Sequence, residues 1–209
     1  MFMEPLQRLN DFRLRAGYLT IDEILELSRT NTIFDPFSVL ISRGVGMGAD
    51  NVIHPAVRIE TGGGSIELGD GNVLFSGTVI AAARGAIAIG DGNELGEGGI
   101  CIRADSGSIR VSDGTRLRNG PEILDGTDIG AGCQILGNIK VKGCMLEAGE
   151  PYTASDPNER GAVLKGYGFA ANIRVGRGSV IFGKGDFDEF PIELQEKYHP
   201  GWRADPGKV

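Results

Sequence analysis

The sequence has little histidine, cysteine and cationic charge for its 209 residues. Its three cysteines (Cys101, Cys133 and Cys144) are an odd number without metal-ligand spacing, so reduced thiols are expected. Lysine and arginine total 21 against 28 acidic residues, which gives a net charge of −7. This balance argues against a nucleic-acid or anionic-membrane partner, because neutralising phosphates requires clustered cations.

Long apolar runs are also missing. No stretch approaches the roughly 20 residues of a membrane span, and the first residues have no apolar signal core. The hydrophobic content of 41% and the charged content of 23% are ordinary for a globular domain. Together with reduced thiols, these features predict a cytoplasmic protein.

What the sequence does have is a six-residue repeat between residues 111 and 146. An aliphatic residue recurs at every sixth position, and a compact residue follows four positions after each. Glycine takes the third position after the first four aliphatics, and Asn138 takes it after the fifth. The aliphatic series is Val111, Leu117, Ile123, Ile129, Ile135 and Val141, and the compact series is Thr115, Pro121, Thr127, Cys133, Ile139 and Met145.

A period of six fits neither a helix nor a simple strand alternation, but a short strand followed by a sharp corner produces it. Glycine supplies the positive φ of the corner, and the aliphatic and compact residues point inward. Three such sides close a triangular coil of about 18 residues, and coils stack at about 4.8 Å. The sequence therefore predicts a mainly β fold, a triangular parallel β-helix. A disordered or collagen-like chain, the alternative for 34 glycines, lacks this period.

We expect three parts along the chain. Residues 1–40 form a helical N-terminal cap, with one helix from Pro5 to Ala16 and a second capped by Thr20 and Glu23 in a capping box. This cap is expected to cover the first coil, and an independent pair of binding helices is the alternative. Residues 41–187 form the β-helix with an inserted loop at 147–171, and residues 188–209 form a C-terminal helix and tail.

The six-residue spacing begins at Ile41 and is expected to resume after the inserted loop. A loop of about 20 residues inside a compact repeat is functional, disordered or simply tolerated. The aliphatic and aromatic residues expected to point inward after it are Phe169, Val175, Ile181 and Phe187. The C-terminal helix is expected from Asp188 to Tyr198.

Three longer units between Ile59 and Val111 each contain Gly-x-Ile and end in an Asp-Gly corner. Their extra loops are expected to stack into a ridge on one edge. Asn72 and Asn93 then fall one coil apart and predict an interior amide ladder. The aspartates of the corners (Asp70, Asp91 and Asp113) form an outward column, either a set of solvated turns or a divalent-cation site.

Units such as Ile129-Gly-Ala-Gly-Cys-Gln and Ile89-Gly-Asp-Gly-Asn-Glu resemble those of the hexapeptide-repeat acyltransferase superfamily, whose members are left-handed parallel β-helices. Residues 48–57 are similar to the first coil of the acetyltransferase domain of sugar-nucleotide uridyltransferases. The resemblance covers about residues 41–187. It implies a homotrimer with ligand sites in clefts between chains. It also implies metal-free transfer of an acyl group from acyl-CoA to a hydroxyl or amine of a small, sugar-like acceptor.

Acyl transfer needs a base to deprotonate the attacking group, and histidine is the usual one. The chain has only His54 and His199. His54, in a His-Pro corner of the first coil, is the catalytic candidate, with a structural role as the alternative. His199 lies in the tail and reaches a neighbouring cleft only if the tail swaps. Two histidines cannot form the three-histidine zinc site of the carbonic-anhydrase branch of the superfamily.

Carboxylates are the other candidate bases: Glu122, Asp125, Asp128 and Glu159. Cations of the loop and the last coils are candidates to bind the phosphates of coenzyme A, with a solvated face as the alternative. These cofactor-binding candidates are Lys165, Arg174, Arg177 and Lys184. The last coil departs from the sugar-acetyltransferase pattern, because Phe-Gly-Lys-Gly-Asp-Phe follows Val180-Ile181. Two hypotheses therefore remain: an acyl-CoA-dependent transferase, and a non-catalytic trimeric binding or assembly protein of the same fold.

Overall fold

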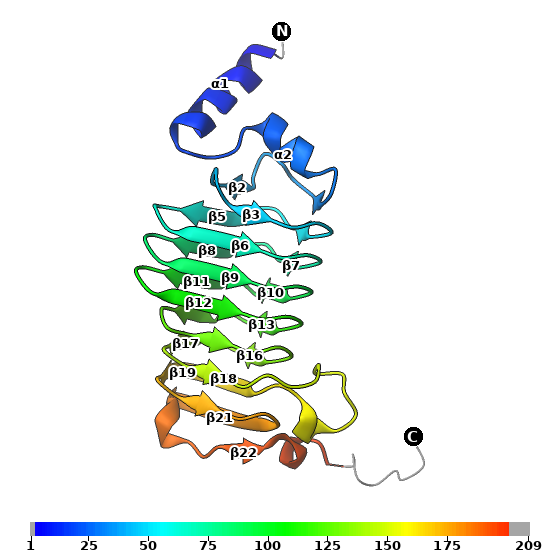
Figure 1. The fold of residues 1–209 in the computed structure, drawn as a ribbon, viewed down its shortest axis with the longest axis vertical. Helices are drawn as coiled ribbons and strands as arrows, with labels where there is room; N and C mark the ends of the chain where they lie inside the picture. Colours follow the sequence, from blue (N-terminus) through cyan, green and yellow to red (C-terminus); the bar gives the residue numbers. More distant parts are fainter. Residues whose placement is uncertain (1–2, 201–209) are drawn as a thin grey trace.

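The computed structural model describes residues 3–200, and the chain winds there into a parallel β-helix with two helices at one end (Figure 1). Strands one coil apart pair in parallel, and they form three stacked columns, which are the three faces of the β-helix. The predicted fold class is confirmed. Within residues 3–200, no helix has the length and apolar content needed to cross a membrane.

Each coil contributes one strand to each face in turn. The first face consists of β1 (Thr32–Ile33), β4 (Val52–Ile53), β7 (Val73–Leu74), β10 (Glu94–Glu97), β13 (Arg116–Arg118) and β16 (Gln134–Leu136). The second consists of β2 (Leu40–Ile41), β5 (Arg58–Thr61), β8 (Thr78–Ala82), β11 (Ile100–Ala104), β14 (Glu122–Leu124) and β17 (Ile139–Lys142). The third consists of β3 (Gly46–Met47), β6 (Ser65–Leu68), β9 (Ala86–Ile89), β12 (Ser108–Val111), β15 (Asp128–Ile129), β18 (Met145–Leu146) and β20 (Arg174–Val175). The first two faces join through the long strand β19 (Val163–Ala171), which pairs with β16, β17 and β21 (Ser179–Asp186).

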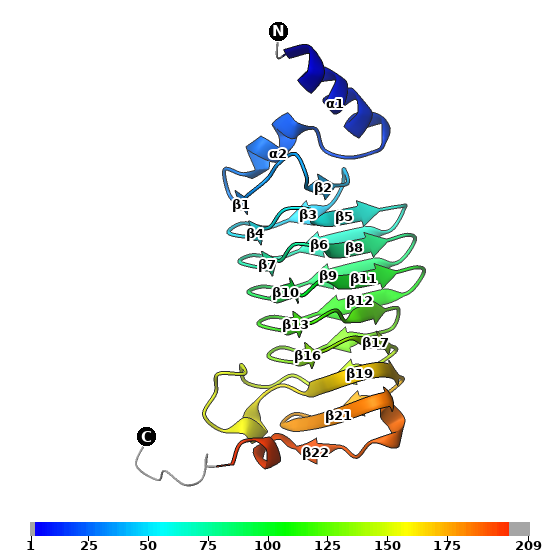
Figure 2. The same ribbon diagram turned by 180° about the vertical axis from the view of Figure 1, so that it is seen from behind.

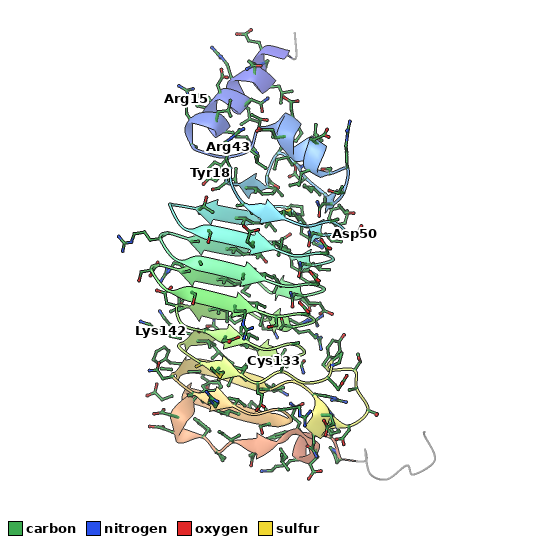
Figure 3. The ribbon with its side chains drawn as sticks, viewed as in Figure 1. Arg15, Tyr18, Arg43, Asp50, Cys133 and Lys142 are labelled. Atoms are coloured by element: carbon green, nitrogen blue, oxygen red, sulfur yellow. The ribbon has the colours of Figure 1, made fainter. Side chains whose placement is uncertain are left out.

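The interior is a stack of aliphatic side chains in the predicted register. Ile59, Ile80, Ile102 and Ile123 pair in successive coils, and all four are buried. Cys133 lies at its predicted inward position (Figure 3). The extra loops after β5, β8 and β11 stack on one edge through backbone hydrogen bonds such as the one from the Ala83 amide to the Ala104 carbonyl, at 2.9 Å. The expected ridge is therefore present.

The predicted asparagine ladder is present and longer than expected. The amide nitrogen of Asn72 donates to the side-chain oxygen of Asn51 at 3.0 Å, and that of Asn93 donates to Asn72 at 2.8 Å. Asn31 accepts from Asn51 at one end, and Thr115 donates to Asn93 at the other. The ladder gives hydrogen-bond partners to five buried polar side chains along one interior corner. Without these partners, their burial would destabilise the fold.

The six-residue spacing shortens at the last coils, and two expectations about inward residues are wrong there. The side from Val141 to Leu146 advances by only five residues, and so does the side from Ala170 to Val175. Strand pairing aligns the two sides, with Val141 beside Ala170 and Leu146 beside Val175. Met145 therefore turns outward and is 41% exposed, and Cys144 takes the interior place. Phe169 is 39% exposed, because Ala170 rather than Phe169 pairs with Val141. The interior also resumes earlier than expected, with Leu164 of β19, so the inserted loop spans residues 147–162.

The N-terminal segment forms α1 (Met3–Arg15) and α2 (Ile21–Leu27), with the predicted capping box of Thr20 and Glu23. Ile24 of α2 belongs to the same buried cluster as the interior of the first coils. Arg43 forms an ion pair with Glu23 at 2.6 Å, and Tyr18 donates a hydrogen bond to Glu60 (Figure 3). α2 thus covers the open end of the β-helix.

The C-terminal end is less helical than expected. Two short 3-10 turns, η2 (Phe187–Glu189) and η3 (Gln195–Tyr198), take the place of the expected helix, and the strand β22 (Glu193–Leu194) pairs antiparallel with β21 between them. Pro191 interrupts a continuous helix from Asp188 to Tyr198, because it lacks the amide proton of an interior helical position. The expected tail beyond residue 200 lies outside the described residues.

Candidate functional site

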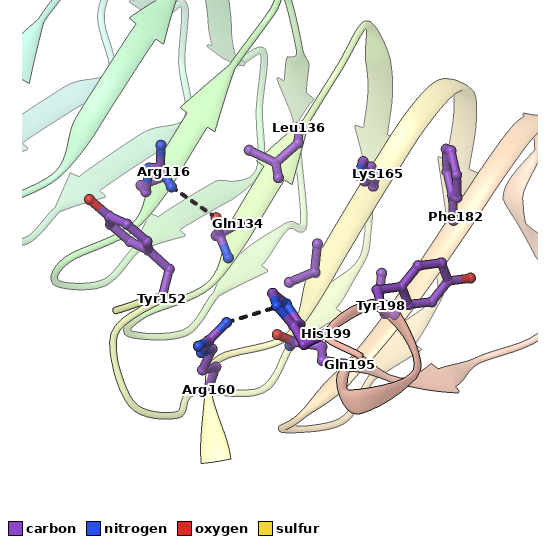
Figure 4. Close-up of a pocket in the computed structure, with 12 residues that line it drawn as sticks. Arg116, Gln134, Leu136, Tyr152, Arg160, Lys165, Phe182, Gln195, Tyr198 and His199 are labelled. Carbon is purple, nitrogen blue, oxygen red and sulfur yellow. Dashed lines mark hydrogen bonds between the residues drawn. The ribbon is translucent and has the colours of Figure 1, made fainter. Parts of the chain in front are cut away.

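A groove lies on the outer side of the first face, near the C-terminal end (Figure 4). Its floor is formed by outward residues of β13, β16, β19 and β21, and its volume is about 240 Å³. The inserted loop and the C-terminal segment form its walls. The lining residues are Arg116, Gln134, Leu136, Tyr152, Arg160, Val163, Lys165, Val180, Phe182, Gln195, Tyr198 and His199.

The walls of the groove are fixed to one another. Asn158, in the 3-10 turn η1 (Pro157–Glu159) of the inserted loop, donates to the Glu196 carboxylate at 2.9 Å and accepts from the Glu196 amide at 3.3 Å. The Gln195 side chain donates to the Gly161 carbonyl at 2.8 Å. The loop and the C-terminal segment are far apart in sequence, so only the folded chain places them together.

The lining is cationic. Arg116, Arg160 and Lys165 carry positive charge, and within the described residues no aspartate or glutamate lines the groove. Arg116 pairs with Glu94 at 3.2 Å, and its guanidinium lies 3.8 Å from the centre of the Tyr152 ring. The Lys165 ammonium lies 5.3 Å from the centre of the Phe182 ring, and no carboxylate in residues 3–200 forms an ion pair with it. Lys165 therefore keeps its charge available for a ligand.

His199 also lies in this groove. Its Nε2 atom is 3.3 Å from Nη1 of Arg160, and because an arginine only donates, Nε2 is the acceptor (Figure 4). Partial burial, followed by the charges of Arg160 and Lys165, lowers the pKa of His199 below its usual value. This lowering favours the neutral imidazole. His199 thus lines a groove of its own chain, and its reach into a neighbouring chain's cleft stays a prediction.

Two glutamines supply directional hydrogen-bonding groups. Gln134 and Gln195 are each more than nine-tenths buried. Gln134 accepts from Arg116 at 3.4 Å, and among residues 3–200 no acceptor meets its amide nitrogen. The amide nitrogen of Gln195 is bonded, but no donor in the described part of the chain meets its oxygen. One donor and one acceptor on well-held side chains thus remain open to a ligand.

His54, the catalytic candidate from the sequence, lies elsewhere. It packs between the rings of Phe34 and Phe75, with ring centres 5.1 Å and 5.2 Å apart, in an aromatic column along an outer corner. It does not line the groove. This packing fits the structural role that the His-Pro corner also suggested.

The four cofactor-binding candidates do not come together in one place. Lys165 lines the groove. Arg174 lies on the third face, in a separate depression beside Met145 and Asp128. Arg177 pairs with Glu159 at 3.1 Å, and Lys184 lies on β21 opposite Tyr167.

The candidate carboxylate bases are all engaged in contacts with other parts of the chain. Glu122 pairs with Lys140 at 3.2 Å, and Asp128 forms a two-point contact with Arg110, at 2.9 Å and 2.6 Å. Asp125 accepts from the Asp105 amide at 2.9 Å. Glu159 is the partner of Arg177. None of the four lines the groove.

Sequence reasoning named Lys165 as a candidate and left the role of the inserted loop open, but did not bring Arg160, Gln134, Gln195 and Tyr152 together. The outward parity of Gln134 was visible in the repeat, since it precedes the inward Ile135. The meeting of Arg160 with His199 left no signal in the sequence. Comparison of the sequence with protein-family models finds no match, and comparison with curated proteins finds no significant match. The fold itself is consistent with hexapeptide-repeat proteins.

Proposed function

We propose that this protein binds a small anionic molecule in the groove. The observation that carries the proposal is the charge of the lining: three cations and no acidic side chain among the described residues, on a chain of net charge −7. A cationic concavity on an acidic protein attracts an anion selectively, because the rest of the surface repels it.

The size of the groove limits the ligand. Its volume of about 240 Å³ is below the roughly 300 Å³ at which drug-sized sites begin. A compound of about one ring with a carboxylate or phosphate fits this space. Lys165 and Arg160 pair with the anionic group, and the open amide groups of Gln134 and Gln195 fix its orientation. The rings of Phe182 and Tyr198 cover the apolar part.

The proposal is tested by thermal shift and calorimetry with inorganic phosphate, acetate, coenzyme A and acetyl-CoA. A ligand that binds only the folded state raises the melting temperature with its concentration. Lys165→Met should weaken binding about tenfold or more, because a hydrogen bond to a charged group contributes about 1.5–3 kcal/mol. Lys184→Met, an exposed lysine outside the groove, is the matched control. No shift with any anion, or an equal loss in the control, contradicts the proposal.

A second candidate function, acyl transfer from acyl-CoA, is favoured by His199. A neutral imidazole accepts the proton of an acceptor hydroxyl or amine at its basic Nε2 atom, which must first leave its contact with Arg160. The deprotonated oxygen or nitrogen then attacks the thioester carbonyl, the coenzyme thiolate leaves, and the proton passes from His199 to the thiolate. The groove holds only the acyl end of acyl-CoA, so the remainder lies along the outer face. This second proposal includes the homotrimer that the resemblance implies, because the ligand clefts of that superfamily lie between chains.

Release of free thiol from acetyl-CoA in the presence of hydroxyl and amine acceptors tests this reaction. His199→Ala should lower the rate by about 10²–10⁴-fold, the usual contribution of a general base. His54→Ala should leave the rate unchanged, because its ring lies in the aromatic column. No thiol release with any acceptor contradicts acyl transfer and leaves anion binding as the function.

A further inference from the structure

Helix α1 buries two polar side chains against the rest of the protein and exposes two large apolar ones. Its most buried described side chains are Asn10 and Arg13, which are 5% and 4% exposed. Phe12 is 62% exposed and Leu14 is 46% exposed. An amphipathic helix that serves only as a cap shows the opposite arrangement. The exposure of Phe12 is therefore unexplained by contacts within residues 3–200.

The polar side holds α1 firmly in this orientation. The Arg13 guanidinium donates to the carbonyls of Leu19, Phe37 and Val39 at 2.9–3.1 Å. The Asn10 side chain accepts from the Ile21 amide at 2.9 Å and so satisfies an open amide at the start of α2. These contacts rule out a simple rotation of α1 that would bury Phe12, because rotation would strip Arg13 of its buried acceptors.

The outward face of α1 forms a shallow depression of about 380 Å³. Among the residues that the structure describes, its lining comes from α1 alone: Glu4, Pro5, Arg8, Leu9 and Phe12. A depression lined by one helix lacks its opposite wall. Figures 1 and 2 show from both sides that α1 projects beyond the first coil, at the end of the molecule farthest from β22.

We infer that this face pairs with α1 of a second copy of the chain, in antiparallel orientation. The lining is self-complementary about a point between residues 8 and 9: a two-fold axis there places Phe12 on the partner copy's position 5, and Leu9 on its position 8. Self-complementarity is what a two-fold interface requires. Burying Phe12 and Leu9 between the two copies stabilises the pair by about 25 cal/mol per Å² of apolar surface removed from water.

The charges of α1 agree with the antiparallel arrangement. Glu4 lies in the first turn, and Arg13 and Arg15 lie in the last. The Arg15 guanidinium lies 4.9 Å from the centre of the Phe12 ring, so it stands beside the place where Glu4 of the second copy arrives. A parallel pair would set Glu4 against Glu4, which is repulsive. An anionic membrane surface is a poorer occupant, because Glu4 lies within the face and the chain is acidic.

Light scattering on the purified full chain tests the inference. Phe12→Asp should halve the molar mass of the assembly, because it separates the two paired units, whether each unit is one chain or a trimer. Leu14→Asp places the same charge on the opposite side of the same helix, outside the depression, and should keep the wild-type mass. Phe12 is exposed, so both variants should keep the wild-type circular dichroism.

A charge exchange adds a test of orientation. Glu4→Arg and Arg15→Glu should each raise the dissociation constant about three- to tenfold, and the double variant should restore the wild-type value. A wild-type mass that Phe12→Asp leaves unchanged overturns the inference. So does a double variant weaker than both single variants, or binding of wild type to phosphatidylserine vesicles that Phe12→Asp abolishes.

Discussion

The carboxylate of Asp91 accepts a hydrogen bond from the backbone amide of Asp70, one coil earlier, at 2.7 Å. Asp113 makes the same contact with Asp91 at 2.8 Å, and Asp70 makes it with Ala49 at 2.7 Å. The aspartate column is therefore a set of bonds between coils. Each carboxylate caps an amide that the corner leaves without a carbonyl partner, which explains the repeated Gly-Asp-Gly corners.

Replacing Asp91 tests this role. Asp91→Ala should lower the free energy of unfolding by about 1 kcal/mol, because one hydrogen bond between coils is lost. Asp91→Asn should cost less, since its side-chain oxygen still accepts. Urea unfolding followed by circular dichroism measures both. Equal stability of wild type and Asp91→Ala would show that the bond contributes nothing.

Gly69 is required by the same contact. A Cβ atom at this position would lie 2.1 Å from Oδ1 of Asp91 and 2.8 Å from the carbonyl oxygen of Gly90. Gly69→Ala should therefore destabilise the fold by about 1–3 kcal/mol, the usual cost of overpacking. Gly176→Ala is the matched control, because the nearest atom to its Cβ would be 3.5 Å away. A control as costly as Gly69→Ala would argue against a clash at Gly69, because Gly→Ala at an uncrowded position stabilises the fold by lowering the entropy of the unfolded chain.

The asparagine ladder should be most sensitive at its centre. Asn72→Ala removes the acceptor of both the backbone amide and the side-chain nitrogen of Asn93, which are buried. Each unsatisfied buried group costs about 1–3 kcal/mol, so a loss of at least about 2 kcal/mol is expected. Thr115→Val, at the ladder end, should cost less. Thermal and urea unfolding of the two variants decide the order, and a larger effect at Thr115 would contradict it.

His199 should titrate below pH 6.5 in the folded protein, because burial and the charges of Arg160 and Lys165 disfavour its protonated form. The contact with Arg160 is therefore present above pH 6.5 and is lost as the pH falls through the lowered pKa of His199. Proton NMR of the imidazole measures this pKa. Arg160→Met should move it upward. A folded pKa of 6.5 or higher in wild type would contradict the geometry.

Cys133 should be inert in the folded chain. Burial raises the pKa of its thiol to about 12, so almost no thiolate is present at pH 8, and the thiolate is the reactive form. Iodoacetamide at pH 8 should label Cys133 only after denaturation. As the pH rises above 9, this thiol ionises in the unfolded chain before it ionises in the folded chain. Its ionisation therefore lowers the free energy of unfolding between pH 9 and about 12. Mass spectrometry of labelled peptides tests the first expectation, and labelling of native Cys133 within minutes would refute it.

The β-helix was predictable because its contacts repeat locally. An interior residue such as Ile102 contacts Ile80 and Ile123, which occupy the same place in adjacent coils, so a fixed spacing in sequence becomes a fixed stack in space. The Asn72–Asn93 ladder followed from the same spacing. The errors arose where a coil loses one residue: a side of five looks regular in sequence, and only pairing with Val141 shows that Ala170, not Phe169, points inward.

The sequence by itself thus determined the period and the interior of the regular coils. The tertiary structure alone decided the groove, because its two walls, the inserted loop and the C-terminal segment, obey no repeat. Arg160 and His199 meet across 39 residues of chain, and nothing in the spacing of either residue encodes that contact. The contact depends on where the last strands end and on how the chain folds back over them. Side-chain packing determines both.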